Sequence, residues 1–116
     1  MNNLNSLILE GTVVENAIVE ETLTGSAICN FFVDVERTYK KGMEDVTEVS
    51  TFEVGTYGTL ARALQPKLVK GTQVRLVGRL KQHRWTDKDG KKWSKIVVVA
   101  EHIEIKWNGG KPKCQK

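Results

Sequence analysis

Hydrophobic side chains recur at every second position along most of this chain, which is the period of a half-buried β-strand. Turn residues separate the stretches that show this period, with glycine following polar residues at Gly25, Gly42 and Gly90. Gly11 interrupts the first stretch and predicts a kink or bulge there. The pattern predicts a mainly β protein with five strands, at residues 7–14, 27–39, 46–57, 72–84 and 93–105.

One segment, residues 59–69, has the period of a helix instead. Three leucines recur in it every four residues: Leu60, Leu64 and Leu68. Gly71 stands where a C-terminal cap belongs, and Pro66 is expected to shorten or kink the helix. Five strands with one short helix between the third and fourth predict an OB-fold barrel, with an extended hairpin between the fourth and fifth strands. A small open β-sandwich is the alternative, and the position of the helix favours the barrel.

The length of 116 residues suits one domain with a modest core. We expect this domain to occupy residues 1–107 and residues 108–116 to form a basic, unpacked tail. The first apolar run is stopped by Glu10, so we expect no signal peptide, no membrane partner and a cytoplasmic protein. Cys29 and Cys114 make neither a disulfide framework nor a metal-binding spacing. We therefore expect no metal and no cofactor.

Charge is distributed unevenly between the two halves of the chain. Residues 1–58 carry three basic and ten acidic side chains, whereas residues 59–116 carry fifteen basic and four acidic side chains. The second half is therefore where a polyanion would dock. A solvated basic surface explains the same distribution, so charge alone leaves both interpretations open.

The strand predicted at residues 72–84 separates a core face from a charged face. Its even positions are apolar, with Gly78 among them: Val74, Leu76 and Leu80. Its odd positions continue past the strand as a row of cations that ends in an aromatic ring: Arg75, Arg79, Lys81, His83 and Trp85. Because strand side chains alternate between faces, this row would lie on the outside of the barrel.

Trp85 and Trp93 flank a turn that contains Asp89-Gly90, a strong hairpin signal. Exposed tryptophan among cations suits a single-stranded nucleic acid, because rings stack on bases and cations meet phosphates. The two tryptophans could instead pack against each other across the hairpin. Further candidates for phosphate contact are Arg84, Lys88, Lys91, Lys92, Lys95, Lys40 and Lys41. Tyr39 and Tyr57 are candidate stacking rings, or aromatic covers of the core.

An enzyme is the competing class of function. Asp34, Glu36 and Glu53 could hold a divalent cation on a β-barrel, as a nuclease requires. Solvated strands often show the same acidic pattern, and neither histidine has an evident nucleophile beside it. The chain also lacks a Gly-rich phosphate loop. We expect no catalytic residue and no catalysis.

The order of short motifs resembles the bacterial single-stranded DNA-binding protein family over residues 3 to about 100. Six motifs carry the resemblance: NSLILEG at 5–11, NFFV at 30–33, YGTLA at 57–61, KGTQV at 70–74, VGRL at 77–80 and RWTD at 84–87. None is specific alone, and their order and spacing together make the signal.

The resemblance implies an OB-fold that assembles as a homotetramer in the bacterial cytoplasm or nucleoid. It further implies sequence-independent binding and protection of single-stranded DNA in replication, recombination and repair. Its stacking aromatics match Tyr39, Tyr57 and Trp85, and Trp93 falls where the family often has another aromatic. The first strand of such proteins commonly pairs two subunits, which would place these residues at a dimer contact: Leu7, Ile8, Leu9 and Val13.

Three departures qualify the resemblance. Thr51 stands where similar proteins often carry a stacking tryptophan, and carboxylates near it, Glu53 among them, would oppose phosphates. The family usually ends in a flexible linker and an acidic tip that recruits replication and repair proteins, whereas residues 113–116 are basic. Whether the chain is shortened or lacks that role stays open. The alternative function is an OB-fold accessory module, of primosome type or RNA-binding.

Overall fold

The computed structural model describes residues 2–107, which hold six strands and one α-helix. In chain order these are β1 (Leu7–Val13), β2 (Ile18–Glu21), β3 (Ala27–Lys41), β4 (Glu44–Tyr57), α1 (Gly58–Leu64), a 3-10 turn η1 (Gln65–Lys67), β5 (Gln73–Thr86) and β6 (Lys92–Trp107). The five predicted strands are confirmed. The short strand β2 was missed, because it has only four residues and is mostly exposed.

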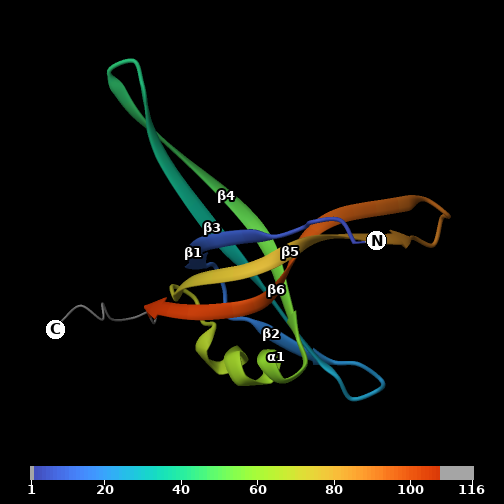
Figure 1. Ribbon diagram of the computed structural model, residues 1–116. Helices are drawn as coiled ribbons and strands as arrows, with labels where there is room; N and C mark the ends of the chain where they lie inside the picture. The colour runs from blue at the N-terminus through green and yellow to red at the C-terminus, as the bar shows by residue number, and fades with distance from the viewer. Residues whose placement is uncertain (1, 108–116) are drawn as a thin grey trace.

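The strands form one sheet that closes on itself. Its order is β1-β5-β6-β4-β3-β2, and β1 also pairs with β3, so five strands make a ring while β2 lies outside it on the edge of β3. All pairings are antiparallel except the one between β4 and β6. Figure 1 shows the ring with α1 against one end. This closure confirms the five-stranded OB-fold barrel and excludes the open sandwich.

Gly11 is where the barrel closes. Strand β1 pairs with β5 from Leu7 to Thr12 and then passes to β3, with which Thr12 and Val13 pair. A Cβ atom on Gly11 would collide with the backbone carbonyl oxygen of Asp34 on β3. The irregularity predicted at this glycine is thus a close approach of two backbones, which any side chain would hinder.

The α-helix ends before Pro66. Helix α1 ends at Leu64, and Pro66 lies in the first turn of η1, because proline cannot donate the backbone hydrogen bond that a continuing α-helix needs. The shortening expected from Pro66 is therefore confirmed, and the α-helix does not continue to residue 69. Leu64 and Leu68 still reach the core, at 8% and 0% exposure, because the backbone N–H of Leu68 bonds the carbonyl of Leu64 across the turn.

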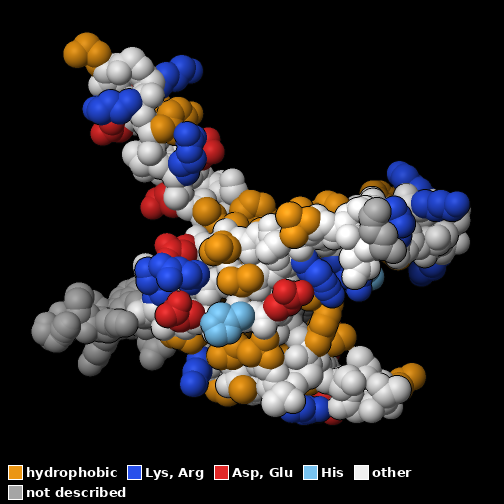
Figure 2. All heavy atoms as spheres, in the orientation of Figure 1, with side chains coloured by type: hydrophobic (Ala, Val, Ile, Leu, Met, Phe, Trp, Pro, Cys, Tyr) orange, Lys and Arg blue, Asp and Glu red, His pale blue; other side chains and the backbone are white. Residues whose placement is uncertain are grey.

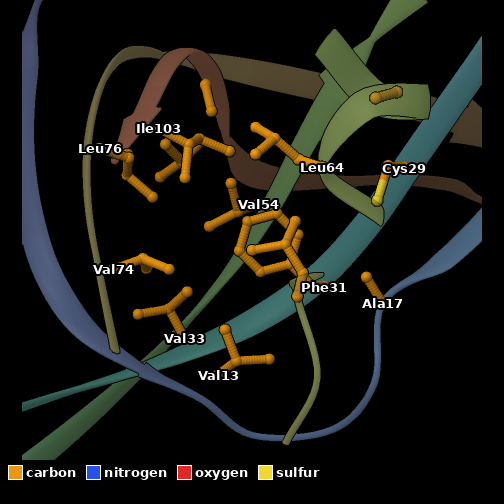
Figure 3. Packing of buried hydrophobic residues seen from close by; sticks show 14 of the residues in the cluster. Val13, Ala17, Cys29, Phe31, Val33, Val54, Leu64, Val74, Leu76 and Ile103 are labelled. Atoms are coloured by element: carbon orange, nitrogen blue, oxygen red, sulfur yellow. The ribbon is translucent and has the colours of Figure 1, made fainter. Parts of the chain in front are cut away.

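The core fills the barrel between α1 and the strands. Figure 3 shows side chains from β1, β3, β4, β5, β6 and α1 converging, among them Phe31, Val54, Leu64, Leu76 and Ile103. Buried Cys29 belongs to the same cluster, and this burial raises the pKa of its thiol, which keeps the sulfur protonated. The alternation predicted for β5 holds at Val74 and Leu76, which are at most 1% exposed.

Two hairpins project from the barrel as arms (Figure 1). The β3–β4 arm turns at Gly42 and the β5–β6 arm turns at Gly90, both with positive φ, which glycine adopts without strain. Leu80, predicted on the core face of β5, is 48% exposed and lies two residues beyond Gly78, where the pairing of β5 with β1 ends. The predicted polar loop at residues 40–45 is largely strand, since β3 runs to Lys41 and β4 begins at Glu44.

Neither helical segment within residues 2–107 combines the length and the apolar character that crossing a membrane requires. The tail predicted at 108–116 lies outside the described residues.

Candidate nucleic-acid interface

Trp85 and Trp93 lie directly opposite each other near the end of the β5–β6 arm. Their exposed fractions are 41% and 43%, so each indole keeps much of its surface open to solvent. Trp85 stacks on His83 with ring centroids 5.4 Å apart and an interplanar angle of 29°. The two tryptophans border a hollow of about 360 Å³, which Arg84, Thr86, Lys92 and Ser94 complete.

The aromatic surface continues along the arm toward the barrel. Lys95 is the cross-strand partner of His83, and its Nζ lies 6.0 Å from the centroid of the Trp85 ring. His83, Lys95 and Tyr57 line a second hollow of about 280 Å³. We name this surface the stacking face, made of five predicted residues that the fold brings together: Tyr57, His83, Trp85, Trp93 and Lys95.

Glu53, which lines the second hollow, forms an ion pair with Lys95. Its Oε1 accepts a hydrogen bond from Lys95 Nζ at 2.8 Å, and its side chain is 24% exposed. The carboxylate expected to oppose phosphates is therefore largely compensated by the neighbouring ammonium. The hydroxyl of Thr51 donates to Asp34 Oδ1 at 2.6 Å, so this position supplies a hydrogen bond to the neighbouring strand and no stacking ring.

The predicted row of cations on β5 divides into two parts. At the barrel end, Arg75 contacts Glu10 at 2.6 Å and Glu104 at 3.6 Å, and Arg79 lies 3.8 Å from Glu101. The hydrogen bonds of Arg75 and then Lys106 lower the pKa of Glu10. These arginines stand among carboxylates, far along the strand from the tryptophans.

Within residues 2–107, the lysines at the arm end take part in no salt bridge, although Asp87 and Asp89 lie in the same turn. Figure 2 shows Lys and Arg side chains gathered at the tip of this arm, where the exposed residues are Lys88, Lys91 and Lys92. Lys81 is also exposed, on the same face of β5 as His83. Arg84 donates to Gln82 Oε1 at 2.6 Å and also lines the hollow that the two tryptophans border.

Tyr39, Lys40 and Lys41 lie on the other arm, which diverges from the stacking face (Figure 1). The guanidinium of Arg37 covers the Tyr39 ring at 4.6 Å, and Lys40 pairs with Asp45 at 3.2 Å. One chain therefore does not bring these three predicted residues beside the tryptophans.

Of the four residues of β1 proposed for a subunit contact, one is largely exposed to solvent. Ile8 is 69% exposed, whereas Leu7 and Leu9 pack against the core. Val13 is 1% exposed within the core of its own chain, so its side chain has no surface to offer a second subunit.

The three carboxylates considered for a cation do not converge. Asp34 accepts from Thr51 and Glu53 pairs with Lys95, as described above. Within residues 2–107, no cluster of three or more His, Cys, Asp or Glu side chains is arranged to hold a metal ion.

Sequence reasoning missed Asn30 and Gly55, which line the hollow beside Tyr57. A Cβ atom on Gly55 would lie 3.2 Å from Asn30 Oδ1, so the bare glycine leaves the floor of this hollow open. The sequence signal was weak: Asn30 is the one polar residue of an otherwise apolar stretch at 27–33. The pairing of β3 with β4 sets Asn30 opposite Gly55 and so places Asn30 beside this hollow.

Comparisons with known proteins agree with this architecture. The single-stranded DNA-binding protein of Treponema pallidum is 31% identical over 105 residues, which are 90% of this chain and 59% of that protein. The corresponding protein of Aquifex aeolicus is 30% identical, over 88% of this chain and 69% of its own length. A solved structure, described as a Plasmodium falciparum SSB complex with ssDNA, has the same fold, with a TM-score of 0.80 and 16% identity over 90% of this chain and 97% of its own.

The chain thus spans about three fifths of the Treponema relative. The model of the "Single-strand binding protein family" matches residues 4–106, nearly all of the barrel and both arms. This chain belongs to the single-strand binding protein family.

Proposed function

We propose that this protein binds single-stranded DNA, without catalysis and with little sequence preference, and protects it during replication, recombination and repair. The observation that carries the proposal is the opposed pair Trp85 and Trp93, both half-exposed among cations at the end of one arm. Stacking tolerates any sequence, because every base has a π-face. Membership in the family supports the choice of DNA as ligand.

The strand would follow the stacking face from the arm toward the barrel. Bases stack on Trp93 and Trp85, pass the Lys95 ammonium and reach the hollow beside Tyr57. Phosphates meet the lysines of the arm tip, since exposed cations attract a polyanion without reading its sequence. A continuous aromatic and basic path of this kind is typical of OB-folds that bind single strands.

We further propose that the protein acts as a homotetramer in the bacterial cytoplasm. Strand β1 supports a subunit contact, because its pairing with β3 is limited to Thr12 and Val13 in the part of the chain described. The edge of β1 before Thr12 is thus open to a strand from a second copy, with Ile8 exposed beside it. Light scattering in solution tests the assembly: a mass of one chain would contradict it.

Tryptophan fluorescence titrated with oligo(dT) tests the function directly. We expect strong quenching, because two of the three tryptophans would stack on bases. Affinity should fall steeply as salt rises, since binding releases condensed counterions. A duplex of equal length is the control and should quench weakly. Absence of quenching and of binding would refute the proposed function.

The Glu53–Lys95 ion pair predicts an unusual gain of affinity. Glu53→Gln removes the carboxylate that holds Lys95, and we expect tighter binding because the ammonium becomes available to a phosphate. The slope of log K against log salt should steepen by about 0.7, the contribution of one more neutralised phosphate on a single strand. Glu15→Gln, at an exposed position between β1 and β2, is the control for charge alone. Weaker binding by Glu53→Gln would show instead that the carboxylate orients Lys95 for its ligand.

A further inference from the structure

The turn of the β5–β6 arm is built around the carboxylate of Asp87. One oxygen, Oδ1, accepts hydrogen bonds from the backbone N–H groups of Asp89 and Lys91, each at 2.9 Å. The other oxygen, Oδ2, accepts from the indole Nε1–H of Trp93 at 2.8 Å. The backbone of Asp87 also bonds Lys91 and Gly90. One side chain therefore joins the turn to a ring of the stacking face.

The same turn contacts one face and one edge of the Trp93 ring. Lys91, whose N–H is held by Asp87, places its ammonium 4.4 Å from the ring centroid and so covers one face. The bond from Nε1 fixes the edge of the ring, which limits rotation about both side-chain torsions. With 43% of Trp93 exposed, the ring keeps open surface that a base can contact.

We propose that Asp87 is a positioning residue for nucleic-acid binding: it holds Trp93 in the orientation in which one face rests against Lys91 and the other accepts a base. This inference rests on the proposed function. The ring is then ordered before the strand arrives, so binding loses less conformational entropy.

A purely structural role explains only part of this arrangement. Aspartate often begins a turn, because its side chain bonds backbone N–H groups two residues on. Those bonds use Oδ1 and leave Oδ2 unnecessary to the turn. The hydrogen bond from Trp93, followed by the backbone bonds, lowers the pKa of Asp87, because these donors favour the charged carboxylate.

Asp87→Asn separates the two roles. Asparagine keeps one oxygen for the backbone N–H groups and is itself a favoured turn residue, but its NH₂ group would face the indole N–H, and two donors cannot bond. Asp89→Asn is the matched control, since it removes the same charge from the same exposed turn. Trp93→Phe keeps a ring for stacking and removes the indole N–H.

The experiment combines NMR with oligo(dT) titration of the full chain. In the wild type, the Trp93 indole N–H resonance, identified by its loss in Trp93→Phe, should carry the shift of a charge-assisted bond, and Asp87→Asn should abolish that shift. Affinity should fall about fivefold in Asp87→Asn, and not in Asp89→Asn. In the Trp93→Phe background, Asp87→Asn should cause no further loss.

Two results would overturn the inference while leaving the function intact. Equal loss of affinity from Asp87→Asn with and without the Trp93 indole would show that Asp87 acts through the turn alone. Unchanged affinity despite a lost indole bond would show that the orientation of the ring is irrelevant. Failure of the wild type to bind oligo(dT) would instead refute the proposed function, and the inference with it.

Discussion

Trp85→Ala is expected to weaken oligo(dT) binding by roughly 5-fold to 150-fold, the equivalent of the 1–3 kcal/mol that a stacked base contributes. Trp85 has the central place on the stacking face: it opposes Trp93, stacks on His83 and lies beside Lys95. Its loss therefore removes a ring on which a base can stack, and Trp93, His83 and Lys95 lose their contact with that ring. Fluorescence anisotropy of a labelled oligo(dT) measures the change independently of the protein's own tryptophans.

Two further variants show whether stacking is the cause. Trp85→Phe should retain most of the affinity, because a smaller aromatic face still stacks. Leu23→Ala changes a fully exposed apolar residue near the β2–β3 turn and should leave binding unchanged. Circular dichroism should show an intact barrel in all three proteins, since position 85 lies on an arm and outside the core. Unaltered binding by Trp85→Ala would remove Trp85 from the interface.

Leu76→Ala should lower the free energy of unfolding by about 2–5 kcal/mol, because it opens a cavity in a close-packed core. Leu76 is 0% exposed and lies among the residues of the barrel interior (Figure 3). For a small domain of typical stability, such a loss is a large fraction of the total. Urea unfolding followed by circular dichroism measures it.

Leu80→Ala is the matched control, with the same substitution on the same face of the same strand. At 48% exposure Leu80 buries much less surface, and we expect a loss below about 1 kcal/mol. The difference in unfolding free energy between the two variants tests how far the core extends along β5. Equal destabilisation by the two variants would mean that the core extends into the arm.

The barrel was predictable because each of its strands has a signal within a short stretch of sequence. Alternation at Val74 and Leu76, the Asp89-Gly90 turn and the leucines around α1 each act over a few residues, and each appears in the structure as expected. The errors arose where residues distant in sequence determine the structure. Strand β2 exists because β3 supplies a partner for it, and Leu80 is exposed where β1, which pairs with β5 only as far as Gly78, no longer lies beside β5.

The stacking face was predictable only in part. The turn itself places Trp85 opposite Trp93, so this pair follows from a short stretch of sequence. Glu53 looked like an obstacle to phosphates because its partner, Lys95, is 42 residues away and the pairing of β4 with β6 is parallel. Arg75 looked available for the same reason, since Glu10 reaches it from a strand 65 residues earlier.

The pairing of β1 with β5 also bears on the order in which we expect the chain to fold. The two arms join residues that are near neighbours in sequence, so they form early at small entropic cost. Strand β1 must wait, because its partner Gly78 lies some seventy residues beyond Leu7. On a ribosome, β1 leaves the exit tunnel long before β5 exists and stays unpaired along that edge. We therefore expect β1, although it precedes β5 in the sequence, to be among the last strands of the barrel to complete its pairing.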